Sequence, residues 1–386
     1  MIRTTTLPAL LLLTLLLAPL ARAQTPIPPP PTVDARSYIL VDAHTGKVLA
    51  SNEPTARAEP ASLTKLMTAY IVFRELASGK LKLDDLATIS EHAWRTGGAG
   101  SGGSTTFLEV GKQVPVKVLV MGMIVQSGND ATIALAERIA GTEETFVQMM
   151  NSTAKQLGML GTHFEDSSGL PSPQHYTTAR DMALLANAII RDFPQYYPWF
   201  SVREFENHGI RQQNRNGLLD RDPGVDGMKT GHTESAGYCL VTSAIRNGVR
   251  LVSVVMGAHS MKGRENASSA LLNYGFTFFD TRLIARRGTR LGSVEMYKAE
   301  RSPVDIGLSH DLWVTVPRDE MASLKSVVET TPALVAPLRS DSVVGRFKVL
   351  GANGQTLVSE PLHPLQPVAP GGLWRRAVDT VRLWLH

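Results

Sequence analysis

Cysteine is nearly absent from this chain, which has a single one, Cys239, among 386 residues. No disulfide can therefore form within the chain, and its stability must come from a hydrophobic core. Hydrophobic residues make up 43% of the sequence, which is enough for a large core. Cys239 lies in the apolar run Tyr238-Cys239-Leu240-Val241, and we predict that it is a buried, unreactive residue.

Metal-binding patterns and a strong net charge are also missing. The ten histidines show no His-Glu-x-x-His or similar spacing, so we expect neither a metal nor another cofactor. The formal net charge is +4, and cleavage of a signal peptide carrying Arg3 and Arg22 would leave 37 basic and 35 acidic residues, a net +2. Because nucleic-acid binders present a strongly basic surface, we expect no nucleic-acid partner.

The N-terminus has the pattern of an export signal. Met1-Ile2-Arg3 is a short positive segment, Leu7 to Leu20 is apolar, and Ala21-Arg22-Ala23 is a small-residue cleavage site. This order predicts a secretory signal peptide over residues 1–23, cut before Gln24. A membrane-spanning anchor is the alternative, but the apolar run is short for a span.

Residues 24–282 combine strand and helix patterns and form the first predicted domain. Strands are predicted at 38–42, 48–50, 225–232, 236–245 and 249–256, the last two joined by the hairpin turn Asn247-Gly248. Helices are predicted from Ser62 onward and over 131–140, 146–157, 179–190 and 271–279, where apolar residues recur at helical spacing.

The composition changes after about Leu283. Short β-like runs at 312–316, 343–350 and 356–359 predict a small β-rich domain over residues 283–366, with 320–328 ambiguous. Residues 367–386 form a predicted amphipathic helix with an apolar face of Trp374, Ala377, Val378, Val381, Trp384 and Leu385. Its other face carries Arg375, Arg376, Asp379, Arg382 and His386. This pattern predicts a helix on a membrane surface, and the alternative is a helix docked on its own domain.

Ser62 and Lys65 lie one helical turn apart in the segment Ala61-Ser62-Leu63-Thr64-Lys65. This spacing can bring a lysine amine to a serine hydroxyl, but Ser62 could equally be a helix N-cap. The same spacing recurs at Ser152 and Lys155 inside a predicted helix, where we interpret both residues as solvated. Ser-x-x-Lys alone is therefore weak evidence of catalysis.

Two further motifs follow Ser62 in a fixed order. Ser127-Gly128-Asn129 lies at a predicted turn before a helix, and Lys229-Thr230-Gly231 lies on a predicted strand edge. The three motifs together resemble those of the serine penicillin-binding proteins and serine β-lactamases. Five longer segments resemble one branch, the low-molecular-mass penicillin-binding proteins that are D-alanyl-D-alanine carboxypeptidases: 61–65, 126–130, 214–219, 225–233 and 262–265.

The resemblance covers nearly the whole chain and implies an α+β fold. An antiparallel sheet flanked by helices, with an all-helical subdomain, would be followed by a small all-β domain and a C-terminal amphipathic helix. It implies an enzyme that removes the terminal D-alanine from peptidoglycan stem peptides, with β-lactams as covalent inhibitors and a role in peptidoglycan maturation and cell shape. The location implied is the periplasm, with the C-terminal helix on the outer face of the inner membrane.

The chemistry assigns catalytic roles to Ser62, Lys65 and Ser127. Ser62 would be the nucleophile and Lys65 its base, but a free lysine, with a pKa of about 10.4, is protonated at neutral pH. Burial and a second cation, for which Lys229 is the natural candidate, would lower that pKa. Ser127 would relay a proton to the leaving amine, and Asn129 would orient Lys65 or the substrate.

Substrate binding is expected along the strand edge from Lys229 to His232, where a peptide can add as a further strand. Gly231 would leave room for its close approach. By resemblance, the backbone N–H groups of Ser62 and His232 form the oxyanion hole. Thr230, Arg215 and Arg264 would bind the terminal carboxylate. For the two arginines, a surface ion pair is the alternative.

Two other functions are compatible with parts of the pattern. A β-lactamase of the same fold needs a glutamate followed by an asparagine, and Glu165-Asp166-Ser167-Ser168-Gly169 has Gly169 where that asparagine would be expected. A non-catalytic wall-binding module with relic motifs is the second alternative. Intact motifs in the right order argue against it.

Overall fold

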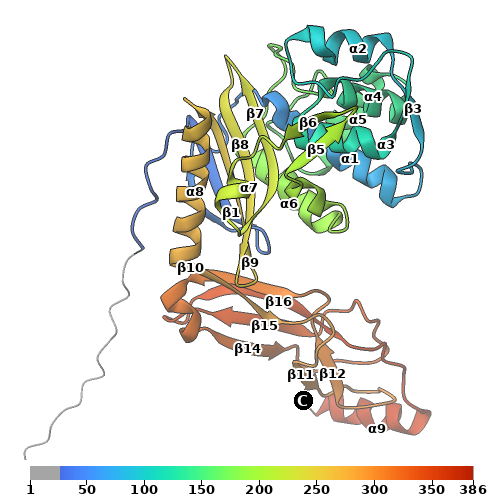
Figure 1. Ribbon diagram of the computed structural model, residues 1–386. Helices are drawn as coiled ribbons and strands as arrows, with labels where there is room; N and C mark the ends of the chain where they lie inside the picture. The colour runs from blue at the N-terminus through green and yellow to red at the C-terminus, as the bar shows by residue number, and fades with distance from the viewer. Residues whose placement is uncertain (1–26, 386) are drawn as a thin grey trace, which may run out of the picture.

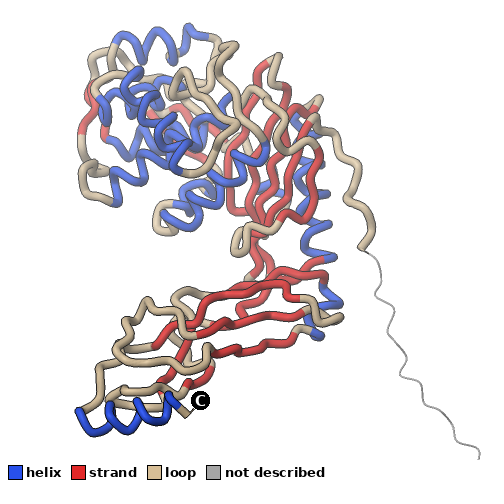
Figure 2. Tube along the Cα trace, turned by 180° about the vertical axis from the view of Figure 1, so that it is seen from behind, coloured by secondary structure: helices blue, strands red, loops and turns tan. Residues whose placement is uncertain are grey.

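A computed structural model describes residues 27–385, so the predicted signal peptide lies outside the described part of the chain. Figure 1 shows a larger body of helices and strands above a smaller body made mainly of strands. Helix α8 (Met261–Phe278) runs along the larger body and leads directly into β10 (Phe279–Ala285), the first strand beyond it. Figure 2 shows the same division from behind, with most helices in the larger body.

A five-stranded antiparallel sheet with the order β2-β1-β9-β8-β7 forms the centre of the larger body. Its strands are β1 (Ser37–Asp42), β2 (Val48–Asn52), β7 (Val225–Thr233), β8 (Gly237–Arg246) and β9 (Val249–Ala258). Side chains alternate between the two faces of a sheet. Val241 therefore packs in the core with α1 (Lys65–Ala77) and α6 (Ala179–Asp192), whereas its neighbour Leu240 packs in the core with α8. Helices on both faces explain why these strands read as continuous apolar runs.

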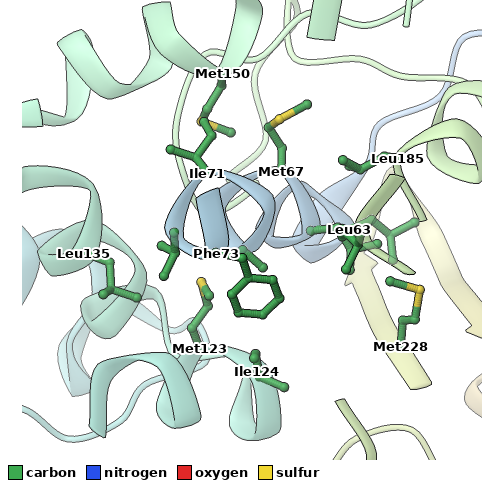
Figure 3. Close-up of a cluster of buried hydrophobic side chains, with 14 of the residues drawn as sticks. Leu63, Met67, Ile71, Phe73, Met123, Ile124, Leu135, Met150, Leu185 and Met228 are labelled. Atoms are coloured by element: carbon green, nitrogen blue, oxygen red, sulfur yellow. The ribbon is translucent and has the colours of Figure 1, made fainter. Parts of the chain in front are cut away.

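Helix α1 is the axis of the helical subdomain. Nine of its thirteen residues are buried, and seven of these nine are apolar, as expected for a helix with packing partners on most sides. Figure 3 shows Met67, Ile71 and Phe73 of α1 surrounded by side chains such as Met123 and Met150 from neighbouring helices. The other helices are α2 (Glu91–Gly97), α3 (Val116–Met121), α4 (Asn129–Ala140), α5 (Glu143–Gln156) and the short α7 (Leu218–Arg221).

Short elements connect these helices and border the sheet. They are the strand pairs β3 (Leu86–Thr88) with β4 (Gln113–Pro115) and β5 (Glu204–Asn207) with β6 (Ile210–Gln213), the 3₁₀ turns η1 (Ala61–Thr64), η2 (Ala99–Ser101) and η4 (Tyr197–Ser201), and the π-helical turn η3 (Gly122–Gln126).

The smaller body is built from antiparallel strands. One sheet has the order β11-β12-β16-β15-β14, and β10 pairs separately with β13. The bounds are β11 (Gly292–Val294), β12 (Val304–Gly307), β13 (Leu312–Pro317), β14 (Lys325–Thr330), β15 (Gly345–Leu350) and β16 (Thr356–Pro364). Its own hydrophobic cluster includes the fully buried residues Ile306, Val349 and Leu362. The predicted fold class, an α+β unit followed by an all-β unit and a terminal helix, is confirmed.

The terminal helix α9 (Leu373–Trp384) contacts the β body through its polar face. Asp379 is buried and accepts a hydrogen bond from the backbone N–H of Lys298 at 2.6 Å, and Arg375 donates to the carbonyl of Glu300. The apolar face points outward, with Trp374 83% and Trp384 90% exposed. Among the described residues, no helix combines the length and the apolar character that crossing a membrane requires.

Most predicted elements differ from the observed ones by a few residues at their ends, and two of the differences have a clear physical cause. The helix predicted over 271–279 begins ten residues earlier, at Met261, where the side chain of Ser260 accepts a hydrogen bond from the N–H of Gly263. Its first turn is polar, so apolar periodicity could not reveal it. The ambiguous stretch 320–328 divides between the 3₁₀ turn η5 (Arg318–Ser323) and strand β14.

The joint between the two bodies has no linker, because α8 ends at Phe278 and β10 starts at the next residue. The hydroxyl of Thr281 donates to the buried carboxylate of Asp42 at 2.7 Å, and the hydroxyls of Thr45 and Thr315 are 2.7 Å apart. The β1–β2 turn of the larger body is thereby fixed to strands β10 and β13 of the smaller one.

Candidate active site

A cleft of about 870 Å³ lies between strand β7 and the helical subdomain. Eight of the ten predicted site residues line it: Ser62, Ser127, Asn129, Arg215, Thr230, Gly231, His232 and Arg264. The two lysines, Lys65 and Lys229, lie in the protein around it, with only 1% and 3% of their surfaces exposed. The structure therefore brings together residues that are spread over 200 positions in the sequence.

Ser62 lies in the 3₁₀ turn η1, immediately before α1 begins at Lys65. The expected N-cap alternative for Ser62 is wrong, since neither η1 nor α1 has a side-chain cap. The hydroxyl of Ser62 instead accepts a hydrogen bond from Lys65 Nζ at 3.0 Å. The half-buried serine is thus free of any capping role and faces the cleft.

Lys65 Nζ has three hydrogen-bond acceptors around it. They are Ser62 Oγ, Asn129 Oδ1 at 2.7 Å and the carbonyl oxygen of Ser168 at 2.6 Å. Burial lowers the pKa of Lys65 to about 7, against the opposing effect of the Asp166 carboxylate and with a contribution from the Arg215 guanidinium. A substantial fraction of this amine is therefore neutral near neutral pH.

A neutral lysine has two N–H donors and one lone pair. The carbonyl oxygens of Asn129 and Ser168 can only accept hydrogen bonds, so they take both N–H groups. The lone pair is then directed to the remaining neighbour, Ser62 Oγ. This arrangement suits a base that removes the proton of the serine hydroxyl.

Lys229 is buried on β7 and donates to the carbonyl of Thr230 at 3.1 Å. Burial lowers its pKa well below the usual value, and the charges of Lys65, Arg215 and Arg264 lower it further. The charge of Arg215 adds to burial in lowering the pKa of Lys65, and Lys65 and Lys229 lie within electrostatic range, so that each disfavours protonation of the other, as the sequence suggested.

Ser127 follows the π-helical turn η3 in a left-handed backbone conformation, with φ of 67°. Gly128 and the start of α4 come next, as the predicted turn before a helix requires. The hydroxyl of Ser127 is buried and has no hydrogen-bond partner within residues 27–385. An unpaired buried hydroxyl at a cleft wall is available to a bound molecule.

Strand β7 is the edge of the central sheet and pairs with β8 alone among the described strands. At Gly231, a Cβ atom would lie 2.9 Å from the carbonyl oxygen of Pro60, so only glycine lets β7 approach η1 this closely. His232 is exposed and its ring stacks on Tyr238, with centroids 4.0 Å apart. Strand β7 therefore passes close to the turn that carries Ser62, and its outer edge pairs with no other described strand.

Arg264 and Arg215 enter the cleft in different ways. Arg264 is 3% exposed, donates from Nη1 to the carbonyl of Gly231 at 3.1 Å, and has an Nε without a partner in the described chain. Arg215 is exposed and makes no hydrogen bond or ion pair with residues 27–385. The surface ion pair considered for both arginines is therefore absent among these residues, and both guanidinium groups retain donors for an anionic ligand.

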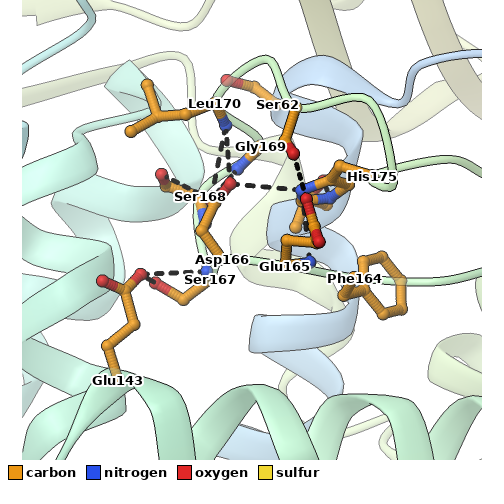
Figure 4. Close-up of polar contacts among 12 residues, drawn as sticks. Ser62, Glu143, Phe164, Glu165, Asp166, Ser167, Ser168, Gly169, Leu170 and His175 are labelled. Carbon is orange, nitrogen blue, oxygen red and sulfur yellow. Dashed lines mark hydrogen bonds and ion pairs between the residues drawn. The ribbon is translucent and has the colours of Figure 1, made fainter.

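The loop 165–170 contains site residues that motif reasoning missed. Its Ser168 binds Lys65 through a backbone carbonyl, which leaves no side-chain signal in the sequence. Asp166 holds the loop by accepting from the N–H groups of Ser168 and Gly169. Burial raises the pKa of Asp166, but its hydrogen bonds with His175 and with this backbone outweigh that effect and lower it to about 2. Figure 4 shows these contacts beside Ser62.

The same loop bears on the β-lactamase alternative. Glu165 is exposed and bonds to Ser172 on the outside of the loop, while the Asp166 carboxylate is occupied by the loop itself. Neither acid is a free carboxylate placed to activate a water beside Ser62. In the described part of the chain, no three His, Cys, Asp or Glu side chains are grouped as a metal site would need.

Comparisons with known proteins agree on one family. The sequence pattern described as D-alanyl-D-alanine carboxypeptidase matches residues 23–260, and that of the penicillin-binding protein 5 C-terminal domain matches residues 279–369. The D-alanyl-D-alanine carboxypeptidases DacA and DacC of Escherichia coli K12 are each 43% identical, over 94% and 96% of this chain and 91% and 93% of theirs. The structure of penicillin binding protein 5 from Haemophilus influenzae superposes with a TM-score of 0.83 at 40% identity, covering 88% of this chain and 99% of that one.

Proposed function

The chain belongs to the D-alanyl-D-alanine carboxypeptidase family and is an enzyme of that activity, and we propose that it works through an acyl-enzyme on Ser62. The substrate is the peptidoglycan stem pentapeptide, from which the terminal D-alanine is removed. The observation that carries this proposal is the environment of Lys65, whose buried amine lies 3.0 Å from Ser62 Oγ between two acceptors.

Acylation begins when Lys65 takes the proton of the Ser62 hydroxyl. The serine oxygen attacks the carbonyl carbon of the penultimate D-alanine, and the backbone N–H groups of Ser62 and His232 stabilise the resulting oxyanion. Collapse of this intermediate breaks the peptide bond. The departing amine receives a proton through Ser127, whose hydroxyl has no other partner in the described chain.

Substrate is held along the edge of β7 as an added strand. Its terminal carboxylate binds the hydroxyl of Thr230 and the guanidinium groups of Arg215 and Arg264, with the Lys229 ammonium nearby when protonated. Asn129 keeps Lys65 in place. Water then attacks the ester carbonyl of the acyl-enzyme, and release of the shortened peptide restores the Ser62 hydroxyl.

β-Lactams would acylate the same serine and leave slowly, as covalent inhibitors. The Haemophilus influenzae relative carries penicillin binding in its name. The structure of the loop 165–170 supports slow hydrolysis of the β-lactam acyl-enzyme. The carboxylate of Asp166 accepts hydrogen bonds from the backbone of this loop and is not free to activate water. We therefore favour a carboxypeptidase that is inhibited by β-lactams over a β-lactamase.

Mass spectrometry of the protein after penicillin treatment tests the acyl-enzyme. We expect one adduct, on the peptide that contains Ser62, and release of D-alanine from a synthetic pentapeptide by the untreated protein. An adduct on another residue, or D-alanine release that persists in a Ser62→Ala variant, would exclude this mechanism.

For its place in the cell, we propose the periplasm and a role in peptidoglycan maturation and cell shape. Residues 1–23 would be removed on export, residues 24–282 would form the catalytic domain and residues 283–366 the β domain. Residues 367–386 would lie on the outer face of the inner membrane. The exposed tryptophans of α9 support this last assignment, because they form an apolar surface that the β body does not cover.

A further inference from the structure

Glu143 is a buried acid outside the motifs, and it lies close to the base of the active site. It is the first residue of α5, and only 8% of it is exposed. One carboxylate oxygen accepts from the N–H of Ser167 at 2.9 Å and from its hydroxyl at 2.6 Å. The other oxygen lies 2.6 Å from Nε2 of His92 on α2. A buried carboxylate with this many partners is held in one position.

The contacts of Glu143 converge on the peptide that supports Lys65. Ser167 is held at its N–H and hydroxyl by Glu143, and at its carbonyl by the hydroxyl of Thr68 at 2.6 Å. The next residue, Ser168, is held at its N–H by Asp166. The carbonyl of Ser168, fixed from both sides, accepts the hydrogen bond from Lys65 Nζ at 2.6 Å. Figure 4 shows Glu143, Ser167 and Ser168 in this order.

We propose that Glu143 is a positioning residue for the reaction: it holds Ser167 so that the carbonyl of Ser168 keeps the Lys65 amine directed at Ser62. The inference rests on the proposed role of Lys65 as the base. Glu143 does not touch the reacting atoms. It acts through one peptide unit, and its contact with His92 also ties α2 to this loop, ahead of the residues Ser101 to Ser104 that line the cleft.

Glu143 also acts on Lys65 through its negative charge. This effect on the pKa of Lys65 distinguishes Glu143 from a residue that only stabilises the fold. Three carboxylates raise the pKa of Lys65, those of Asp166, Asp130 and Glu143. The guanidinium of Arg215 lowers it. Lys229 also lies within electrostatic range of Lys65. Loss of the Glu143 charge lowers the pKa of Lys65. The acidic limb of the pH–rate profile, where the amine loses its proton, then moves to lower pH.

The test compares Glu143→Ala, Glu143→Gln and the control Glu144→Ala, using the full chain. Glu144 is the adjacent residue on α5, but it is exposed and does not contact the loop 165–170 in the described structure. The rate of Ser62 acylation by a fluorescent penicillin is measured across pH, and thermal melting verifies that each variant is folded.

We expect Glu143→Ala to slow acylation by roughly 10- to 100-fold, because Ser167 loses its acceptor and the Ser168 carbonyl shifts away from Lys65. Glu143→Gln keeps a carbonyl oxygen for Ser167, so it should restore most of the rate. The acidic limb should lie at lower pH than in the wild type for both variants and be unchanged in Glu144→Ala.

Two results would overturn the proposal: a Glu143→Ala variant that matches Glu144→Ala in rate and pH profile, or a folded Glu143→Gln variant as slow as Glu143→Ala. A failure of the underlying mechanism is recognised separately, since labelling would then persist in Ser62→Ala.

Discussion

The first Ser-x-x-Lys pair, Ser62 and Lys65, lies at the junction between a 3₁₀ turn and α1. The second pair, Ser152 and Lys155, lies inside α5. Both pairs have the same spacing. Lys65 is 1% exposed and has three hydrogen-bond acceptors, while Ser152 and Lys155 are exposed and their side chains make no hydrogen bonds within residues 27–385. The spacing brings a lysine near a serine, but only burial makes that lysine a base.

The comparison also shows what the first pair receives from distant parts of the chain. Asn129 comes from the start of α4, and Ser168 from a loop more than 100 residues after Lys65. The second pair lies on a face of α5 that is exposed in the described structure. A short motif therefore gains its chemistry from the tertiary structure around it.

Replacing the serines should give the largest difference in activity between variants of the two Ser-x-x-Lys pairs. Ser62→Ala should reduce D-alanine release and penicillin labelling by at least about a thousand-fold, because the nucleophile is gone. Ser152→Ala should leave both unchanged. Equal activity of the two variants in a D-alanine release assay would remove the distinction between the pairs.

Replacing the lysines should give the second largest difference, in the rate of acylation. Lys65→Met fills the same space without an amine and should slow acylation by about 10²- to 10⁴-fold, the usual contribution of a general base. Lys155→Met is the matched control and should have the wild-type rate. The measurement is the rate of labelling by a fluorescent penicillin, with thermal melting as the test of folding.

The pH dependence of acylation should distinguish Lys65 from an ordinary exposed lysine. Acylation needs neutral Lys65, so the rate should rise with pH through about 7, the pKa of this residue. The Arg215→Gln variant loses a cation that lowers the pKa of Lys65. The acidic limb of its pH–rate profile should therefore move to higher pH. Arg211→Gln, which removes an exposed arginine paired with Glu204 and Glu206 on the neighbouring β5–β6 hairpin, should leave it in place. A limb at the same pH in both variants would contradict the role of Arg215.

The smallest effect on catalysis is expected at the other end of the molecule. Deletion of residues 370–386 removes α9, which contacts the β body and not the cleft. D-alanine release should stay at the wild-type level, while binding to phospholipid vesicles should be lost with the exposed tryptophans. Vesicle binding that survives the deletion would refute the proposed membrane surface.

Sequence patterns predicted the parts of this molecule that depend on local order. The hairpin at Asn247-Gly248, the turn at Ser127 to Asn129 and the core helices follow from turn residues and apolar spacing. The motif order also predicted that residues from Ser62 to Arg264 share one site, and they border a single cleft.

The remaining features depend on contacts that no pattern encodes. Ser168 acts through its backbone, so its side chain gives no indication of its place beside Lys65. The effect of Arg215 on the pKa of Lys65 depends on a tertiary contact between segments 150 residues apart, which no motif encodes. The polar docking face of α9 was unexpected because a helical projection places Asp379 among solvated residues, whereas it is buried.

The direct passage from α8 into β10 has a geometric consequence. An α-helix turns by about 100° and advances by about 1.5 Å with each residue. One residue inserted in or deleted from α8 would therefore turn the start of β10 by that angle relative to the cleft, and the β body could follow only if the hydrogen bonds of Thr281 with Asp42 and of Thr45 with Thr315 broke. The number of residues in α8, together with these hydrogen bonds, thus sets the angle between the direction in which the cleft opens and the direction in which the α9 tryptophans face.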